Sequence, residues 1–302
     1  GHNGMVGSSI LRRIKTESCR VVTVSRDELD LRDQSKVYSW IGDNNIDVVI
    51  LAAAKVGGIL ANSKYPADFL YDNMAIQNNV INGSHLAGVK KLVFLGSSCI
   101  YPKLSKQPIK EQDLLQGALE ETNQWYAIAK IAGIKLCQAY RRQYNCDYIS
   151  LQPTNLFGPG DNFDEQNSHV IPGLIRRLHD AKNRQAKSVK IWGSGEPLRE
   201  FLYVDDLADA VLFSIKKYSD ETPINVGAGK EISIARLAEL IQDAIQYDGE
   251  LKFDHSKPDG TPRKLLDISR LQSLGWRPKT RLVDGIKYTV DSFSAGQEAR
   301  VN

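Results

Sequence analysis

Gly1-His2-Asn3-Gly4-Met5-Val6-Gly7 opens the chain, and an amphipathic stretch follows over residues 8–14. Glycines at this spacing allow a tight turn, and they let the N–H groups at a helix N-terminus approach a pyrophosphate. The alternative is a glycine-rich surface loop. A strand should precede a turn of the first kind. We therefore expect the first strand of the fold to be missing from these 302 residues.

Short β-branched runs alternate with helical patterns after this opening. Strands are expected at residues 20–25, 46–51, 91–95 and 148–152, and helices at 67–87 and 126–144. Runs such as Val48-Val49-Ile50-Leu51 are apolar on both faces, as in a sheet that helices cover on both sides. The sequence predicts an α/β fold with a Rossmann-like doubly wound parallel sheet.

Glycine and proline become frequent after about residue 155, in 157–160, 192–197 and 257–262. Helical patterns return at 204–217, 233–247 and 283–293. We expect residues 1–155 to form the cofactor-binding domain and 156–302 to form mainly a smaller C-terminal α/β substrate-binding domain. Residues 200–218 are expected to return to the first domain.

Composition narrows the class of protein. Hydrophobic residues make up 42% and charged residues 25%, as in compact globular proteins. The net charge of +3 is too small for a nucleic-acid or membrane-surface partner. Four cysteines without C-x-x-C or zinc spacing indicate no disulfide scaffold and no metal site. This cysteine pattern fits a reducing cytosol and no apolar run is long enough to span a bilayer, so we expect a cytoplasmic protein.

Arg26 follows the apolar run 21–24, at the place where an acidic residue would hold the ribose hydroxyl of NAD. An arginine there favours a 2′-phosphate, and therefore NADP. The alternative is a solvated arginine in a turn. Asp33 could touch the adenine or cap the helix that follows it, and we favour the cap.

Tyr126 and Lys130 lie at i and i+4 on an expected helix and therefore share a face. A phenol has an ordinary pKa of about 10, so a neighbouring ammonium is needed to make it useful in acid–base chemistry near neutrality. Ser97 follows the strand expected at 91–95, where its hydroxyl could bond a substrate carbonyl beside that phenol. A chance Y-x-x-x-K in a structural helix is the alternative.

These residues resemble the extended branch of the short-chain dehydrogenase/reductase superfamily, and in more detail the GDP-L-fucose synthase family. The resemblance rests on residues 51–59, 62–69, 94–103, 153–156, 167–172 and 256–267, and it runs over essentially the whole chain. It implies a bifunctional enzyme that epimerises GDP-4-keto-6-deoxy-D-mannose at C3 and C5 and then reduces C4 with NADPH, giving GDP-L-fucose. Asn3 departs from the pattern, because some members carry an arginine there.

The resemblance also implies roles for individual residues. Cys99 and His169 would be the acid–base pair of epimerisation, and Ser97, Tyr126 and Lys130 the reductive set. The alternatives are a small buried cysteine and a histidine that caps or packs. The implied cofactor site comprises Gly1, Asn3, Gly4, Met5, Val6, Gly7, Arg26, Leu95, Gly96, Lys130, Pro153, Asn155, Leu156 and His169.

Arg177, Trp192, Arg199 and Asp259 would bind the nucleotide part of the substrate. Arg177 could instead lie at an exposed helix end, and Trp192 in the core. Lys264 is a further candidate outside this set. The resemblance implies a homodimer in which the helices at 67–87 and 126–144 form a four-helix bundle.

Two other functions fit the same pattern. One is another nucleotide-sugar epimerase or dehydratase of the extended branch, although a dehydratase typically has Asp-Glu where this chain has Ser98-Cys99. The other is a non-catalytic dinucleotide sensor, which commonly lacks the tyrosine or the lysine.

Overall fold

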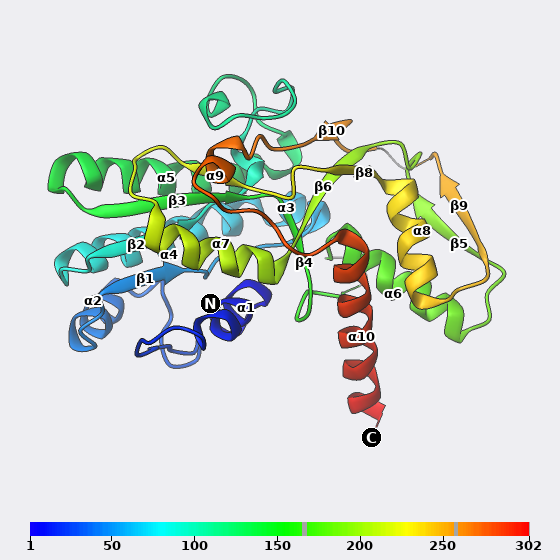
Figure 1. Cartoon of the computed structure of the whole chain (residues 1–302), viewed down its shortest axis with the longest axis horizontal. Coiled ribbons are helices and arrows are strands. Elements are labelled where there is room, and N and C mark those ends of the chain that lie inside the picture. Colours follow the sequence, from blue (N-terminus) through cyan, green and yellow to red (C-terminus); the bar gives the residue numbers. More distant parts are fainter. Residues whose placement is uncertain (165–167, 257–258, 302) are drawn as a thin grey trace.

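The N-terminal part of the protein is a parallel sheet with helices on both faces (Figure 1). This computed structural model describes residues 1–164, 168–256 and 259–301. Its helices are α1 Met5–Ile14, α2 Gln34–Asp43, α3 Ile59–Lys64, α4 Pro66–Leu86, α5 Gln124–Tyr144, α6 Val170–Asn183, α7 Val204–Lys217, α8 Ile234–Ile245, α9 Ser269–Ser273 and α10 Leu282–Val301. Its strands are β1 Val48–Leu51, β2 Lys91–Leu95, β3 Asp147–Pro153, β4 Asn155–Phe157, β5 Ser188–Trp192, β6 Leu198–Tyr203, β7 Ile224–Val226, β8 Glu231–Ser233, β9 Glu250–Asp254 and β10 Arg263–Lys264.

The first sheet has the strand order β1-β2-β3-β7, and all its pairs are parallel. Successive residues of β2 point into different layers. Leu92 and Phe94 join the core under α2, α4 and α5, whereas Val93 and Leu95 join the core under α1 and α7. Burial on both sides explains why the strand is a continuous apolar run.

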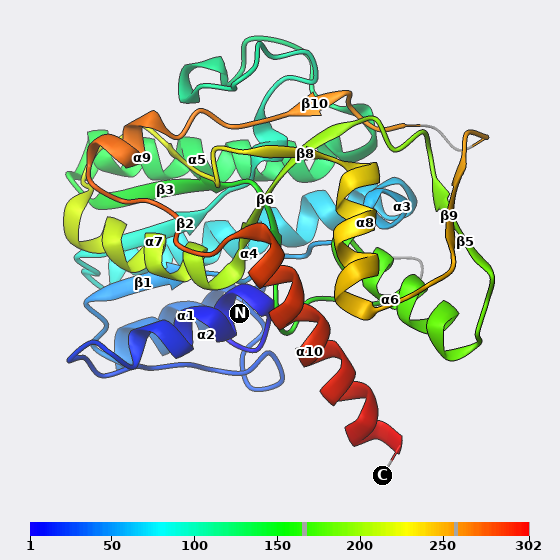
Figure 2. The same cartoon turned by 45° about the vertical axis from the view of Figure 1, so that its right-hand side comes forward.

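The C-terminal part is built around β6, which pairs with β4, β8 and β10 (Figure 2). Helices α6, α8 and α10 share one core with β5 and β6, and β9 pairs with β5 in a separate sheet. Between these elements the chain crosses back to the first sheet. Ile10 of α1 packs in the same cluster as Leu207 and Val211 of α7, and β7 extends the first sheet.

The strand predicted at 20–25 is wrong. This segment has no ladder with any of the residues that the structure describes, and β1 stands at the edge of the sheet. Extended backbone becomes a strand only when a neighbour receives its hydrogen bonds. The other predicted strands and helices are present. The elements at 91–95 and 204–217 have the predicted bounds, the ends of the others are shifted by one to a few residues, and the final helix is longer.

The cap predicted at Asp33 is confirmed, because its carboxylate accepts a hydrogen bond from the backbone N–H of Lys36 at the start of α2. Within the described ranges, no helix is both long and apolar enough to cross a membrane.

Candidate active site

The glycine turn packs directly on the first sheet. Gly1 lies so close to the backbone of Ala52, just after β1, that a β-carbon would overlap it, and Gly7 lies even closer to the Gly1 carbonyl. Gly4 is the N-cap of α1 and, having no side chain, makes no side-chain cap hydrogen bond. A glycine-lined helix N-terminus with free N–H groups fits the pyrophosphate of a dinucleotide.

A second turn, at residues 26–28, lies beside the glycine turn. The pKa of Glu28 is lowered mainly by its hydrogen bonds with Ser25, and the nearby His2 lowers it further. Arg26 and Asn3 are both exposed, one in each turn. Met5 and Val6 are the first two residues of α1. Glu28, two residues after Arg26, thus lies within electrostatic range of His2 in the glycine turn, and the exposed Arg26 is free of cover by other side chains.

Ser97 stands at the carboxyl end of β2, after Leu95 and Gly96. Its backbone N–H donates to Gln152 Oε1 at 3.1 Å, and its hydroxyl accepts from the Cys99 N–H at 3.2 Å. Gly96 lies directly over the Gln152 side chain, so that a β-carbon there would overlap the amide. The fully buried Gln152 thus fixes the backbone that carries Ser97.

Tyr126 and Lys130 face this strand end from α5. The Lys130 ammonium donates to the Leu95 carbonyl at 2.8 Å and lies 5.7 Å from the centre of the Tyr126 ring. Burial lowers the pKa of Lys130 to about 8. Burial also raises the pKa of Tyr126, with a further rise from Cys99 and an opposing effect from Ser97. The phenol is therefore protonated at neutral pH and can donate a proton.

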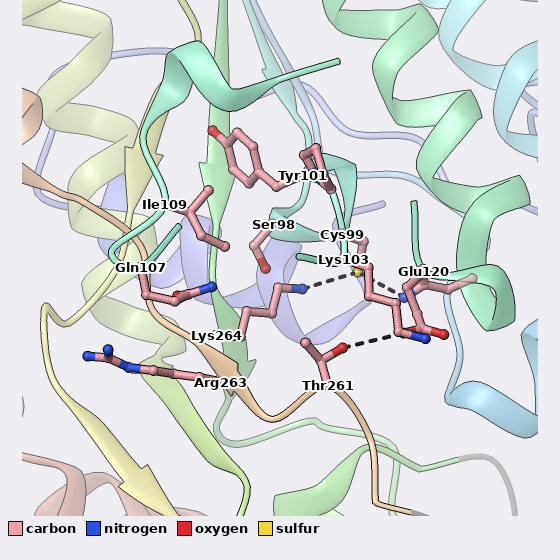
Figure 3. Close-up of a pocket in the computed structure, with 12 residues that line it drawn as sticks. Ser98, Cys99, Tyr101, Lys103, Gln107, Ile109, Glu120, Thr261, Arg263 and Lys264 are labelled. Carbon is pink, nitrogen blue, oxygen red and sulfur yellow. Dashed lines mark hydrogen bonds and ion pairs between the residues drawn. The ribbon is translucent and has the colours of Figure 1, made fainter. Parts of the chain in front are cut away.

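Cys99 lies beside Tyr126, on the wall of the pocket in Figure 3. Its sulfur accepts a hydrogen bond from Asn123 Nδ2 at 3.5 Å and another from Lys264 Nζ at 3.8 Å. The side chain is half-buried, so it is accessible to a ligand in the pocket. The structure therefore brings together four predicted residues: Ser97, Cys99, Tyr126 and Lys130.

His169 comes from another element, immediately before α6. The His169 residue is exposed to solvent by surface area, but protein atoms surround its ring closely enough for burial to lower the pKa of the imidazole. A side chain that lies in a recess of the surface has both properties. Among the residues that the structure describes, no hydrogen bond joins His169 to Cys99. Asn167, in the same predicted motif, lies outside the described residues, as do Lys257 and Pro258.

Pro153 ends β3, and Asn155 and Leu156 belong to β4. The Asn155 amide donates to the backbone carbonyl of Glu200 in β6 at 2.8 Å. Beyond β4, Gly160 approaches the first turn of α1, because a β-carbon there would lie 3.7 Å from the Met5 Cα. This segment thus leads from the end of the sheet to the glycine turn.

The four candidates for nucleotide binding form two pairs, one in contact and one linked electrostatically. The Arg177 guanidinium stacks over the Trp192 ring at 5.4 Å, and Arg177 Nη1 donates to the Lys190 carbonyl. Trp192 is 53% exposed, so it is not a core residue, and Arg177 lies in the middle of α6 rather than at its end.

Arg199 and Asp259 form the second pair, in which the carboxylate acts electrostatically on the guanidinium. Both Asp259 oxygens accept hydrogen bonds from Ser194, and these bonds are the main cause of its lowered pKa. Arg199 is aligned with Lys264 across β6 and β10. A continuous path of neighbours therefore runs from Cys99 through Lys264 and Arg199 to Asp259.

Sequence reasoning missed Gln152 and Asn123. Gln152 is a polar residue inside an otherwise apolar strand, and that irregularity was the available signal. Asn123 precedes an expected helix, where an asparagine is ordinarily interpreted as a cap. In the structure its side chain makes no cap hydrogen bond.

A glycine turn on a parallel sheet, with a serine at a strand end and a tyrosine and a lysine on the helix facing it, defines a dinucleotide-dependent α/β enzyme. Residues 1–227 match the NAD dependent epimerase/dehydratase family, and the chain belongs to it. GDP-L-fucose synthase of Sinorhizobium fredii is 55% identical over 293 residues, covering 97% of this chain and 93% of the relative. The Escherichia coli GDP-L-fucose synthase is 52% identical, covering 99% and 96%. Within the larger family, the chain belongs to the GDP-L-fucose synthases.

The solved structures agree with this placement. A GDP-L-fucose synthetase from Naegleria fowleri, bound to NADP, superposes with a TM-score of 0.91 at 31% identity, covering 99% of this chain and 93% of that one. The predicted Rossmann-like parallel α/β fold is thereby confirmed.

Proposed function

We propose that this protein converts GDP-4-keto-6-deoxy-D-mannose to GDP-L-fucose, by epimerisation at C3 and C5 followed by reduction at C4. The observation that carries the proposal is the position of Cys99, close enough to Tyr126 to act on it electrostatically. A reductase needs only the Ser97, Tyr126 and Lys130 set. A second proton-transfer group beside that set is what an epimerase requires.

Epimerisation follows from the chemistry of a ketone at C4, which acidifies the C–H bonds at C3 and C5. Cys99 and His169 serve as the acid–base pair on opposite faces of the sugar. The lowered pKa of His169 keeps its imidazole neutral at physiological pH, so it can accept a proton. Ser97 and Tyr126 donate hydrogen bonds to the ketone oxygen and stabilise the enolate.

Reduction uses the same oxygen site. NADPH, when bound, supplies the hydride that C4 accepts. Tyr126 gives its proton to the developing alkoxide, and its raised pKa ensures that the proton is present. The Lys130 ammonium then lies close to the phenolate that remains.

The residues that hold the cofactor are those at the glycine turn and along the strand ends. They are Gly1, Asn3, Gly4, Met5, Val6, Gly7, Arg26, Leu95, Gly96, Lys130, Pro153, Asn155, Leu156 and His169. Arg177, Trp192, Arg199 and Asp259 hold the guanosine diphosphate, mainly from the part formed by residues 156–302. Arginine suits the diphosphate because its planar fork bonds two oxygens at once.

The assembly in this proposal is a cytoplasmic homodimer, in which α4 and α5 pair with the same helices of a second copy. Exposed aromatic and aliphatic side chains on these helices, Tyr71, Trp125 and Ile128, support such a surface. Light scattering after size-exclusion chromatography should give twice the 33.7 kDa mass of the chain. A monomer at micromolar concentration would contradict this part of the proposal.

The central experiment is to follow NADPH absorbance at 340 nm with GDP-4-keto-6-deoxy-D-mannose and to identify the product by NMR. Consumption of NADPH with formation of GDP-L-fucose is expected. Cys99→Ser should then impair epimerisation more than cofactor binding. NADPH binding without consumption would instead favour an epimerase that returns its hydride, or a dinucleotide sensor.

A further inference from the structure

Two hydrogen-bond donors converge on the Cys99 sulfur from different parts of the fold (Figure 3). Asn123 precedes α5, which packs on the first sheet, whereas Lys264 belongs to β10, which pairs with β6 in the second sheet. Neither residue belongs to the Ser97, Tyr126 and Lys130 set. Their shared contact is the sulfur.

The Asn123 amide is directed to the sulfur rather than to the helix that it precedes. Asparagine at a helix start ordinarily accepts from a free helix N–H, and here that bond is not made. Its Oδ1 is buried and, within the described ranges, has no hydrogen-bond partner. The contact with Cys99 is therefore the one hydrogen bond of this side chain that the described residues provide.

The Lys264 ammonium also donates a hydrogen bond to the sulfur. Across the described parts of the chain, its ammonium has no carboxylate partner within salt-bridge distance. Lys103 lines the same pocket, but its ammonium pairs with Glu120 at 3.1 Å and makes no hydrogen bond with the Cys99 sulfur. The two lysines thus differ in the one contact that matters for the sulfur.

We propose that Asn123 and Lys264 are positioning residues that hold the Cys99 sulfur and stabilise the negative charge it carries during epimerisation. This inference rests on the proposed function. A charged sulfur is a stronger acceptor than a neutral thiol, and a lysine ammonium beside it supplies the opposite charge. Both groups donate, so the pair favours the state in which the sulfur accepts.

The proton balance of the step shows when that charge exists. As the C–H bond beside the C4 ketone breaks, its proton forms an S–H bond, and the electron pair of the C–H bond becomes the enolate. A proton from the opposite face then forms the new C–H bond. The sulfur is negative before it accepts a proton, and also after it has donated one, so the two donors act in either direction.

The test measures epimerisation apart from reduction. Deuterium incorporation at C3 and C5 of GDP-4-keto-6-deoxy-D-mannose is followed by NMR in D₂O with NADP⁺, which cannot reduce the ketone. Lys264→Met keeps most of the side-chain length without the ammonium and should slow exchange by about tenfold or more. Lys264→Arg should recover a large part of the rate, and Asn123→Ala should also slow exchange.

Lys103→Met is the matched control, because it removes a cation from the same pocket wall without removing a hydrogen bond to the sulfur. It should leave the exchange rate within about twofold, and NADPH affinity should be unchanged in all four variants. Thermal melts identify any variant that fails to fold. If Lys264→Met is the one variant that fails to fold, the exchange rates of Lys264→Arg and Asn123→Ala test the proposal.

Exchange at the wild-type rate in Lys264→Met and Asn123→Ala would overturn the inference, as would equal slowing by Lys103→Met. Wild-type protein that binds NADPH but exchanges no deuterium would overturn the proposed function, and the inference with it. The two failures are therefore distinguished by the wild-type measurement.

Discussion

At the scale of single residues, the buried ammonium of Lys130 predicts how stability depends on pH. Burial lowers its pKa in the folded protein to about 8, from 10.5 when exposed. Between these values the unfolded chain binds more protons than the folded one, so stability rises with pH. The free energy of unfolding should increase by about 2 kcal/mol from pH 7.5 to 9.5 through this group.

Urea unfolding of the wild type and of Lys130→Met at several pH values isolates this contribution. The difference between their unfolding free energies should change with pH in the wild type's favour. Parallel pH profiles for the two proteins would show that Lys130 does not titrate in this window.

Tyr126 is the second residue with a direct prediction. Tyr126→Phe removes the proton donor and should lower the rate of C4 reduction by roughly 10²-fold to 10⁴-fold. NADPH affinity should stay within about twofold, because the ring remains. Stopped-flow reduction and a fluorescence titration separate the two effects. Tyr288→Phe, on the exposed face of α10, is the control and should leave both unchanged.

The sequence predicted the reactive groups of the site better than the groups that hold them. The spacing of Ser97, Tyr126 and Lys130 indicates their chemistry, and the resemblance to a known family indicates that of Cys99. Gln152 and Asn123 contact Ser97 and Cys99 across 55 and 24 residues of chain. Such contacts depend on how strands and helices pack, and no local pattern encodes them.

At the scale of elements, Gly7 of α1 packs against the carbonyl of Gly1 in the glycine turn. From this packing we predict how a change at Gly7 affects cofactor binding. Gly7→Ala would place a methyl group against the Gly1 carbonyl and move the turn away from the helix. NADPH affinity should fall by about tenfold or more, because the pyrophosphate site depends on this spacing. Calorimetry measures the affinity.

Gly42→Ala in α2 is the matched control, since a β-carbon there meets nothing within 4 Å. It should leave NADPH affinity unchanged and stabilise the helix slightly. Equal affinities for the Gly7 and Gly42 variants would contradict the role of the turn.

Elements also show where sequence patterns are insufficient. The run at 20–25 has strand composition but no ladder partner among the described residues, whereas the similar run in β2 lies between β1 and β3. The amino-acid composition of a segment indicates whether its backbone can adopt an extended conformation. Its neighbours decide whether it forms a strand.

At the scale of the whole molecule, Glu200 joins the two parts. The side chain is fully buried, and its two oxygens accept from the backbone N–H groups of Gly229 and Leu266. Glu200→Gln would turn an amide NH₂ toward one of these donors and leave it without an acceptor. A loss of about 1–3 kcal/mol in unfolding free energy is expected.

Chemical denaturation measures this loss, and Glu239→Gln on the surface of α8 is the control, with little change expected. If Glu200→Gln were as stable as the wild type, its carboxylate would not be what couples the segments around it.

The origin of the two donors on Cys99 has a mechanical consequence. Ser97 follows β2, and Tyr126 and Lys130 lie on α5, which packs against the first sheet, so the three groups proposed for the hydride step belong to one part of the molecule. The contact of Lys264 with the sulfur crosses the joint between the halves. Carbon-acid chemistry should therefore be sensitive to hinge motion, and a viscous cosolvent should slow deuterium exchange more than hydride transfer.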